Sequence, residues 1–485
     1  MDEVRSVKNE SFPVVIIGGG PAGLTAAFQL TERDIQPLVL EQGEQVGGLA
    51  RTEVFKDYRF DIGGHRFYTK VPEVQRLWEQ MLGDDFLKVQ RLSRIYYDGR
   101  FYHYPIEPFN ALTNLGLRES ILTLVSYLRS KLFPYPVEET FEQWVSNRFG
   151  RRLYRMFFKT YTEKVWGIPC NLIQSEFAAQ RIKGLSLVAT VWEALFPTNN
   201  IKSLIHEFHY PRLGPGMMWE RFREAIEKRA GQVRTGAQVL QLKREGNRIA
   251  CVTVRRGGVD EEIGGEHFIS TMPLSELIFR ITPPPPAEVV EAARGLHYRA
   301  FIIVELILNR ENVFPDDWIY IHSPEVKVGR IQNFKNWSAA MVPDPHKTSL
   351  GMEFFCNEGD DIWTMTDVAL IAQAARELAV LGLAGADEVE DGTVLRQPKA
   401  YPVYDPGYRG RLKIIRQYLA SIENLQTLGR NGMHRYNNQD HSMLTGMLAV
   451  RNLSGETHDL WDVNTDRSYY EEFVVDETQG DSEGL

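Results

Sequence analysis

A run of branched apolar residues followed at once by closely spaced glycines decides the fold of this chain: Val14-Val15-Ile16-Ile17-Gly18-Gly19-Gly20-Pro21-Ala22-Gly23. An alanine-rich stretch follows, and a second apolar run ends on Glu41. This order predicts a strand, a glycine turn, a helix and a strand, the unit that binds dinucleotides. We expect Gly18 to permit the tight turn, Gly20 to let the backbone approach a pyrophosphate, and Gly23 to let helix and strand pack closely. The helix N-terminus offers N–H groups to the phosphates, and Glu41 stands where an acid accepts ribose hydroxyls.

Two further glycine pairs indicate which dinucleotide is bound. Gly47-Gly48-Leu49 follows the ribose acid, and Gly63-Gly64-His65 comes soon after. A glycine pair behind the ribose acid is typical of FAD proteins, so the sequence favours FAD over NAD. The second pair would let the backbone touch a flat ring, which places His65 at the flavin. The alternative for His65 is an ordinary core or surface histidine.

Size and charge exclude several classes of protein. The chain has 485 residues, 43% hydrophobic and 25% charged, enough for two or three domains. Its 64 acidic and 55 basic side chains give a formal net charge of −9, which argues against a general nucleic-acid binder. The distant Cys170, Cys251 and Cys356 argue against a disulfide framework or a zinc site.

The expected location follows from what the sequence lacks. The amino-terminal residues carry no apolar core of a signal peptide, and no run reaches the ~18 apolar residues of a membrane span. We therefore expect a cytoplasmic protein without a metal site. Peripheral contact with a membrane and a homo-oligomer both stay open.

The pattern of predicted elements gives an α/β fold class. We expect a discontinuous Rossmann-type FAD-binding domain, an inserted helical substrate or cap domain, and an antiparallel-sheet substrate domain. The FAD-binding domain takes residues 12–70, 210–280 and 395–455, and its strand over 233–242 brings Val239 to the cofactor. The other pieces are the helical domain 105–205, the mixed sheet-rich domain 71–104 with 285–394, and a flexible tail over 471–485.

Two local patterns refine this division. Asp98-Gly99 between aromatic strands predicts a tight hairpin. A stripe at helical spacing follows, with basic residues interspersed: Ile121, Leu122, Leu124, Val125, Leu128, Arg129 and Lys131. We interpret the stripe as the buried face of the helical domain, the usual role of such a pattern. A membrane-facing amphipathic helix is the alternative.

A polar segment near the carboxyl end carries the remaining cofactor prediction. It contains Gly429-Arg430 and the run Asn438-Gln439-Asp440-His441-Ser442. Helical spacing begins just after Asp440, which predicts that Asp440 caps the helix. A helix start directed at the flavin would place a positive dipole end beside the negative charge of the reduced ring. We therefore assign the segment to the cofactor, with a capped surface helix as the alternative.

Segments spread over most of the chain resemble UDP-galactopyranose mutases, especially the longer eukaryotic type. They are Gly63-Gly64-His65, Lys164-Val165-Trp166, Ala179-Gln180-Arg181, Trp318-Ile319-Tyr320, Tyr401-Pro402 and Asn438-Gln439-Asp440-His441-Ser442. The resemblance implies a mutase that uses reduced FAD as nucleophile to interconvert pyranose and furanose forms of a nucleoside-diphosphate sugar. It also implies NAD(P)H as the reductant and cell-envelope polysaccharide biosynthesis as the setting.

The same resemblance implies roles for individual residues. Arg181 and Arg330 match two arginines that clamp the diphosphate, and His65 matches a residue beside the flavin. Substrate contacts are implied for Trp166, Tyr320, Tyr401 and Tyr436, and we expect Trp337 to contact the substrate as well.

The sequence also departs from the family pattern. Trp337 stands where the family has a phosphate-binding tyrosine, and Glu163 replaces an apolar residue. The loop between Tyr436 and Asn438 is shorter than in the eukaryotic pattern. These departures leave the sugar and the nucleotide open, including another nucleotide sugar or a lipid-phosphate sugar.

Two other functions share the amino-terminal motifs. A net flavin oxidoreductase would resemble protoporphyrinogen oxidase or a carotenoid desaturase and would need no pair of phosphate-binding arginines. A non-catalytic FAD-binding scaffold would need neither Arg330 nor the polar segment around Asn438.

Overall fold

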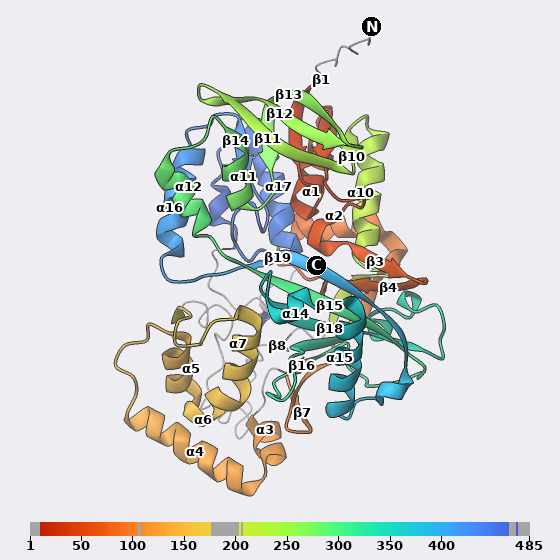
Figure 1. Cartoon of the computed structure of the whole chain (residues 1–485), viewed down its shortest axis with the longest axis vertical. Coiled ribbons are helices and arrows are strands. Elements are labelled where there is room, and N and C mark those ends of the chain that lie inside the picture. Colours follow the sequence, from red (N-terminus) through yellow and green to blue (C-terminus); the bar gives the residue numbers. More distant parts are fainter. Residues whose placement is uncertain (1–9, 105–107, 176–202, 205–206, 465–471, 474–485) are drawn as a thin grey trace, which may run out of the picture.

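The computed structural model describes residues 10–104, 108–175, 203–204, 207–464 and 472–473. It confirms the predicted α/β fold class. Two sheets, each with its own helices, form two halves of the molecule, and a third group of helices lies beside the second sheet (Figure 1).

The first sheet contains the predicted dinucleotide-binding unit. Its strand order is β10-β2-β1-β13-β12-β11-β14, and β20 also pairs with β13. The glycine-preceding strand β1 pairs in parallel with β2 and β13, and its residues 14–17 are all buried, as expected for a strand covered on both faces. The strands are β1 (Glu10–Ile17), β2 (Pro37–Leu40), β10 (Gln232–Arg234), β11 (Ala237–Glu245), β12 (Arg248–Arg256), β13 (Val259–Ser270), β14 (Ile281–Thr282) and β20 (Leu425–Thr427).

Helices cover both faces of this sheet because alternate strand residues point to opposite sides. Val14 and Ile16 pack with α1 (Pro21–Thr31), α2 (Pro72–Leu82), α10 (Gly216–Lys228) and α17 (Gln439–Leu453). Val15 and Ile17 pack on the other side with α11 (Leu274–Arg280), α12 (Ala287–Arg294) and α16 (Tyr408–Leu419). The predicted boundary at residue 70 assigns α2 to the domain of the second sheet. In the structure, α2 shares its core with α1 and not with the second sheet.

The second sheet has the order β19-β15-β18-β17-β16-β6-β7 and is antiparallel except between β16 and β6. Its strands are β6 (Ser93–Tyr97), β7 (Arg100–His103), β15 (Tyr298–Leu308), β16 (Trp318–Ile321), β17 (Arg330–Asn333), β18 (Thr348–Cys356) and β19 (Val389–Pro402). The predicted hairpin is confirmed: Asp98 and Gly99 join β6 to β7 with φ of 51° and 71°. Its helices are α13 (Phe334–Trp337), α14 (Asp361–Thr364) and α15 (Asp367–Val380).

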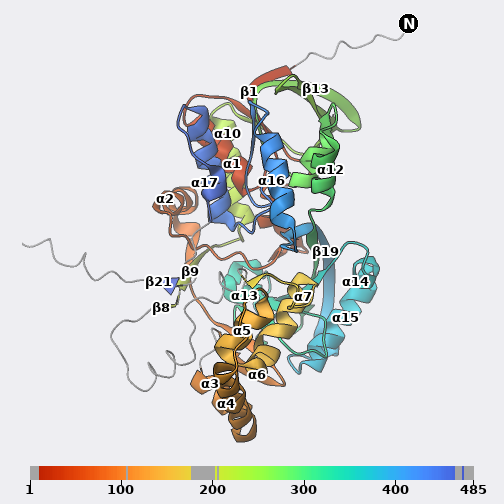
Figure 2. The same ribbon diagram turned by 90° about the vertical axis from the view of Figure 1, so that its left-hand side faces the viewer.

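Several small elements lie outside the two main sheets. The short strand pairs are β3 (Thr52–Phe55) with β4 (Tyr58–Asp61), β5 (Phe86–Gln90) with β9 (Glu207–Pro211), and β8 (Ser203–Leu204) with β21 (Glu472–Phe473). Single helical turns cover Gly48–Ala50, Gly83–Asp85, Ala339–Met341, Ala386–Glu388 and Leu460–Asp462. The long strand β19 carries the chain from the second sheet back towards α16, and both views show it between the halves (Figures 1 and 2).

The third group of helices has an aromatic core. Its elements are α3 (Pro108–Leu115), α4 (Leu117–Leu132), α5 (Phe141–Phe149), α6 (Arg151–Leu153), the π-helical segment Tyr154–Lys159 and α7 (Thr160–Trp166). Phe141, Trp144 and Phe157 of this group pack with Ile95 and Tyr102 of the hairpin, which fixes the group to the second sheet.

The buried-face interpretation of the stripe in α4 is wrong. Ile121, Leu124, Val125 and Leu128 are 53%, 57%, 57% and 51% exposed, whereas Thr123, Tyr127 and Ser130 are buried. The predicted helix is present, but it turns its polar side inward. None of the helices in the described ranges is long and apolar enough to span a membrane.

Candidate flavin and substrate site

A cavity of about 1840 Å³ lies where the two sheets meet. Its wall includes the glycine turn after β1 at one end and Tyr320, Arg330 and Tyr401 of the second sheet at the other. Ordinary small-ligand pockets hold ~300–1,000 Å³. The cavity therefore has room for a dinucleotide and a second ligand.

The dinucleotide end of the cavity is built from backbone. Gly18 has a φ of 105°, and a Cβ there would overlap the Thr271 hydroxyl. Gly20 precedes α1, which starts at Pro21 and has no cap from any described side chain, so its first N–H groups are left for an anion. A Cβ on Gly48 would lie 3.2 Å from the Gly20 Cα, so the two predicted glycine loops meet at one point of the wall.

Glu41 directly follows β2, lies in the cavity wall and fixes the backbone at Gly19 and at Gly43. Its Oε2 accepts a hydrogen bond from the Gly19 N–H at 2.8 Å, and its Oε1 accepts one from the Gly43 N–H at 2.7 Å. Each carboxylate oxygen can accept more than one hydrogen bond. The uncapped helix, the side-chain-free cradle and this carboxylate together fit the pyrophosphate and ribose of FAD.

Four other predicted cofactor residues fall into two groups. Leu49 and Val239 lie in the cavity wall. Gly23 and Gly47 lie behind it, since a Cβ on Gly23 would overlap the Gly18 carbonyl oxygen and one on Gly47 would lie 3.0 Å from the Trp219 ring. These two glycines shape the cradle without lining it.

The Gly63–Gly64 turn carries His65 into the wall at the opposite end. Burial lowers the pKa of His65 to about 3, and the neighbouring Arg430 and Arg330 cations act in the same direction. His65 is therefore neutral at pH 7. Its Nδ1 has no hydrogen-bond partner among the described residues, which leaves that nitrogen for a bound ligand.

The predicted polar segment also lines the cavity: Gly429, Arg430, Asn438, Gln439, Asp440, His441 and Ser442. The prediction that Asp440 caps α17 is wrong, because the helix begins at Gln439 and Asn438 holds the cap position. Asp440 is the second residue of the helix, in its first turn, and is 2% exposed. Burial raises the pKa of Asp440 to about 7, although the positive end of a helix favours a carboxylate.

Arg330 stands beside the Gly63 turn and is held by a buried acid. A Cβ on Gly63 would lie 3.5 Å from the Arg330 Nη2. Arg330 Nε and Nη2 contact Glu353 Oε2 at 2.8 and 2.6 Å, and Glu353 is 0% exposed. Gln332 donates to the other oxygen, Glu353 Oε1, at 2.9 Å. This network fixes the guanidinium in the wall of the cavity.

Aromatic side chains form the remaining wall at this end. The rings of Tyr401 and Tyr436 stack at 5.7 Å with 15° between their planes. The Arg430 guanidinium lies 4.1 Å from the Tyr436 centroid and 4.9 Å from that of Tyr401. Burial, followed by the effect of Tyr436, raises the pKa of Tyr401 to about 12, so its hydroxyl stays protonated at neutral pH. Tyr320, the third predicted tyrosine, packs edge-to-face on Tyr161 at 5.4 Å.

Three predicted substrate residues do not form the contact surface that was expected of them, or lie outside the described residues. Trp166 is 5% exposed and packs at 6.3 Å from Tyr401 and Tyr436, behind the cavity wall. Trp337 lines the cavity, but its indole N–H already donates to the Asp317 carbonyl at 2.9 Å, and its 2% exposed ring packs on Phe208, Tyr210 and Trp318. Arg181 lies outside the described residues.

Sequence reasoning missed the partner that holds Arg330. The signal was present: Glu353 is a lone acid inside the apolar strand β18, and a buried charge needs a partner. Tyr161, stacked at 4.9 Å on the buried His322, was also missed and lines the cavity.

Sequence comparisons find known proteins that are similar to part of this chain. The L-amino-acid oxidase of Crotalus adamanteus is 25% identical over 335 residues, which cover 63% of this chain and 60% of that protein. A 1-hydroxycarotenoid 3,4-desaturase of a Flavobacterium species is 24% identical over 272 residues, 51% of this chain and 55% of that protein. The chain thus matches a little over half the length of these relatives.

Solved structures extend the likeness in fold to nearly the whole chain. The structure of a reduced UDP-galactopyranose mutase superposes with a TM-score of 0.82 and 21% identity, over 95% of this chain and 99% of that one. An Exiguobacterium protein titled putative protoporphyrinogen oxidase gives 0.70 and 17%, over 93% and 100%. The model of the flavin-containing amine oxidoreductase family matches residues 21–405. The chain belongs to the flavin-containing amine oxidoreductase family and is a FAD enzyme of that superfamily.

Proposed function

We propose that this protein is a FAD-dependent mutase that interconverts the pyranose and furanose forms of a nucleoside-diphosphate sugar. The observation that carries the proposal is Arg330, held in the cavity wall beside the Gly63 turn and near an aromatic wall. Bound there in its reduced form, FAD would supply an electron-rich nucleophile, so the protein needs no nucleophilic side chain of its own. NAD(P)H is the proposed reductant.

Arg330 is suited to hold a diphosphate leaving group. Glu353 takes the Nε and Nη2 side of the guanidinium, and the Nη1 side can still donate. A planar guanidinium matches phosphate oxygens well. Because the ion pair fixes the side chain before a ligand arrives, little ordering is left to oppose binding. We propose Arg181 as the second clamp.

The aromatic wall is suited to the sugar and the nucleotide. The protonated hydroxyl of Tyr401 and the hydroxyl of Tyr436 can donate to phosphate or sugar oxygens, and their rings exclude water. Tyr320 and the cavity-lining edge of Trp337 complete the proposed substrate contacts, and Trp166 supports the stack from behind. A neutral His65 adds no positive charge of its own beside the ring.

A net flavin oxidoreductase is the second candidate, and one feature favours it. Glu353 neutralises Arg330, and a neutral pair does not require an anionic substrate. The sequence relatives named above are an amino-acid oxidase and a desaturase. Such an enzyme would need its flavin oxidised at the start of each turnover.

The redox state of the cofactor therefore separates the two candidates. Holoprotein would be incubated without oxygen with UDP- and dTDP-sugars, once with oxidised and once with dithionite-reduced flavin. The mutase converts sugar only in the reduced state, which chromatography of the nucleotide sugars would show. Oxidation of an L-amino acid by the oxidised holoprotein, with no sugar conversion in either state, would support the oxidoreductase instead.

A further inference from the structure

Helix α4 and the segment behind it display an apolar surface to solvent. Nine of the sixteen large hydrophobic side chains that are exposed in the described part of the chain fall in this stretch: Leu117, Ile121, Leu122, Leu124, Val125, Leu128, Leu132, Phe133 and Val137. Leu117, Leu132 and Phe133 are 80%, 73% and 75% exposed. Scattered single hydrophobic residues are normal on a surface, but a contiguous patch of this kind marks an interaction site.

The opposite face of α4 is fixed to its neighbours by small and polar residues. A Cβ on Gly150 would lie 2.9 Å from the Tyr127 Cα, so the absence of a side chain there lets α4 approach closely. The Arg152 N–H donates to the Ser126 hydroxyl at 3.1 Å, and Thr123 is buried. The outward direction of the apolar face is therefore set by packing on the other side.

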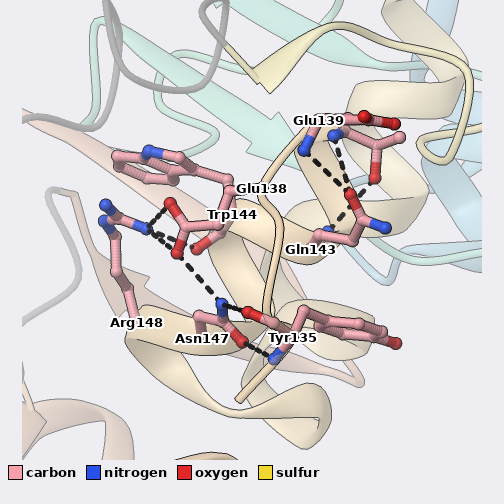
Figure 3. Close-up of polar contacts among 8 residues, drawn as sticks. Tyr135, Glu138, Glu139, Gln143, Trp144, Asn147 and Arg148 are labelled. Atoms are coloured by element: carbon pink, nitrogen blue, oxygen red, sulfur yellow. Dashed lines mark hydrogen bonds and ion pairs between the residues drawn. The ribbon is translucent and has the colours of Figure 1, made fainter.

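The segment that follows α4 is also anchored, as Figure 3 shows. Asn147 accepts from the Tyr135 N–H at 2.8 Å and donates to the Tyr135 carbonyl at 3.0 Å. Arg148 donates to Glu138 at 2.8 Å, and the Gln143 side chain accepts from the Glu139 N–H at 3.0 Å. These contacts hold the chain behind α4 against α5, so its exposed apolar residues keep a defined position.

Positive charge borders the apolar face. Residues 117–137 contain three basic side chains, Arg118, Arg129 and Lys131, and one acid, Glu119, in a chain with a net charge of −9. With 3.6 residues per turn, Arg118 and Arg129 lie along one edge of the apolar face and Lys131 lies along the other. Glu119 is occupied by Arg152, whose Nε lies 2.9 Å from its Oε2.

We propose that α4 and the segment to Val137 dock on an anionic lipid bilayer, with α4 lying in the plane of its interface. An apolar face bordered by lysine and arginine is the composition of interfacial helices, whose basic side chains reach up to lipid phosphates. Both views place α4 at the outer tip of the molecule, away from the first sheet, where a flat surface can reach it (Figures 1 and 2). The docking is independent of the reaction in the cavity.

A second copy of this chain fits the surface less well. Parallel pairing of two α4 helices would place each basic residue beside its own equivalent, and antiparallel pairing would place Arg118 near Arg129 and Lys131. Glu119 is already engaged and offers no compensation. Like charges would meet in both arrangements, whereas lipid phosphates complement them.

Flotation of FAD-loaded protein with vesicles tests the proposal. Wild-type protein is expected to float with phosphatidylcholine–phosphatidylglycerol vesicles, less so at high salt, and much less with phosphatidylcholine alone. Leu124→Glu with Leu128→Glu should lower the bound fraction by at least about tenfold. The matched control is Val368→Glu with Val380→Glu on α15, residues that are 79% and 62% exposed, which should bind as wild type does.

A second variant keeps the test decisive if the first loses flavin. Arg118→Gln with Arg129→Gln and Lys131→Gln should weaken binding to anionic vesicles several-fold and leave the flavin content unchanged. The proposal is overturned if wild-type protein floats with neither vesicle or equally with both. It is also overturned if the protein forms a dimer that only the Leu124→Glu, Leu128→Glu variant disrupts.

Discussion

The two ends of the cavity are built from different materials. The dinucleotide end is backbone: glycines 18, 20 and 48, and the uncapped start of α1. The other end is side chain: an ion pair between Arg330 and Glu353 and a stack of tyrosines. An added side chain at the first end would overlap neighbouring atoms at Gly18 or occupy the space expected for the cofactor at Gly20, whereas the contacts at the second end can be altered one at a time. Variants at the two ends should therefore fail in different ways.

The largest effect is expected at the side-chain end. We expect Arg330→Ala to lower turnover of the nucleotide sugar by at least about 100-fold, because a guanidinium contact to a developing charge is worth several kcal/mol. It should also cost ~3–5 kcal/mol of stability, because Glu353 stays buried without its partner. Steady-state kinetics and urea unfolding measure the two effects.

Removing both charges of the Arg330–Glu353 pair separates the effect on turnover from the effect on stability. Arg330→Met with Glu353→Gln should recover most of the stability but none of the activity. Arg255→Ala, which removes an exposed partner of Asp260, is the control and should change neither quantity. Loss of FAD from the Arg330→Ala variant in its folded state would show that this side chain belongs to the cofactor end.

The next effect sharpens the backbone end. A Cβ on Gly20 meets only Gly48 atoms, the nearest at 3.8 Å, so the apoprotein should accept Gly20→Ala without strain. Because the pyrophosphate is expected at this point, we predict a 10- to 100-fold loss of FAD affinity, ~1.4–2.7 kcal/mol. Gly410→Ala, where a Cβ meets nothing within 4 Å, is the matched control. Fluorescence titration measures the FAD affinity of both variants. Equal affinities would show that the pyrophosphate does not bind beside Gly20.

A pH effect tests the polar segment between the two ends. The pKa of Asp440 rises from 3.8 to about 7 on folding, so its stability contribution is present below pH 4 and lost as pH rises through 7. Apoprotein should therefore lose on the order of 4 kcal/mol over this range relative to Asp440→Asn. Asp61 and Asp317 titrate in both proteins and cancel in the comparison. Urea unfolding of both proteins at pH 4 and pH 7 measures this loss. An equal difference in unfolding free energy between wild type and Asp440→Asn at the two pH values would contradict a buried, neutral carboxyl.

The smallest effect concerns one hydroxyl. Tyr436→Phe keeps the ring that stacks on Tyr401 but removes a donor, so KM for the nucleotide sugar should rise about 2- to 12-fold, ~0.5–1.5 kcal/mol. FAD content should not change. Tyr135→Phe, in the segment behind α4, is the control and should leave KM unaltered. A large loss of kcat with unchanged KM would instead place this hydroxyl at the reacting atoms.

The same contrast explains how much could be predicted from the sequence. The Asp98-Gly99 hairpin depends on neighbours a few residues away, and the glycine turn and Glu41 follow the fixed order and spacing of a dinucleotide-binding unit, so these patterns were sufficient. The partner of Arg330 lies 23 residues along the chain and across a strand pair, and no local spacing indicates it. The periodicity of α4 predicted a helix with an apolar face, but the direction of that face depends on Gly150 and its surroundings. The proposed domain boundaries and site roles stay predictions.

The most direct test of the central claim compares the number of sugars converted with the number of flavins oxidised. Holoprotein would be reduced once without oxygen, the excess reductant removed, and UDP-galactopyranose added while the visible absorbance of the flavin is followed. A mutase converts many sugars per flavin while the flavin stays reduced, because no electrons leave the reaction. Reoxidation of the flavin with at most one product per cofactor, or no furanose at all from a fully reduced protein, would contradict the account.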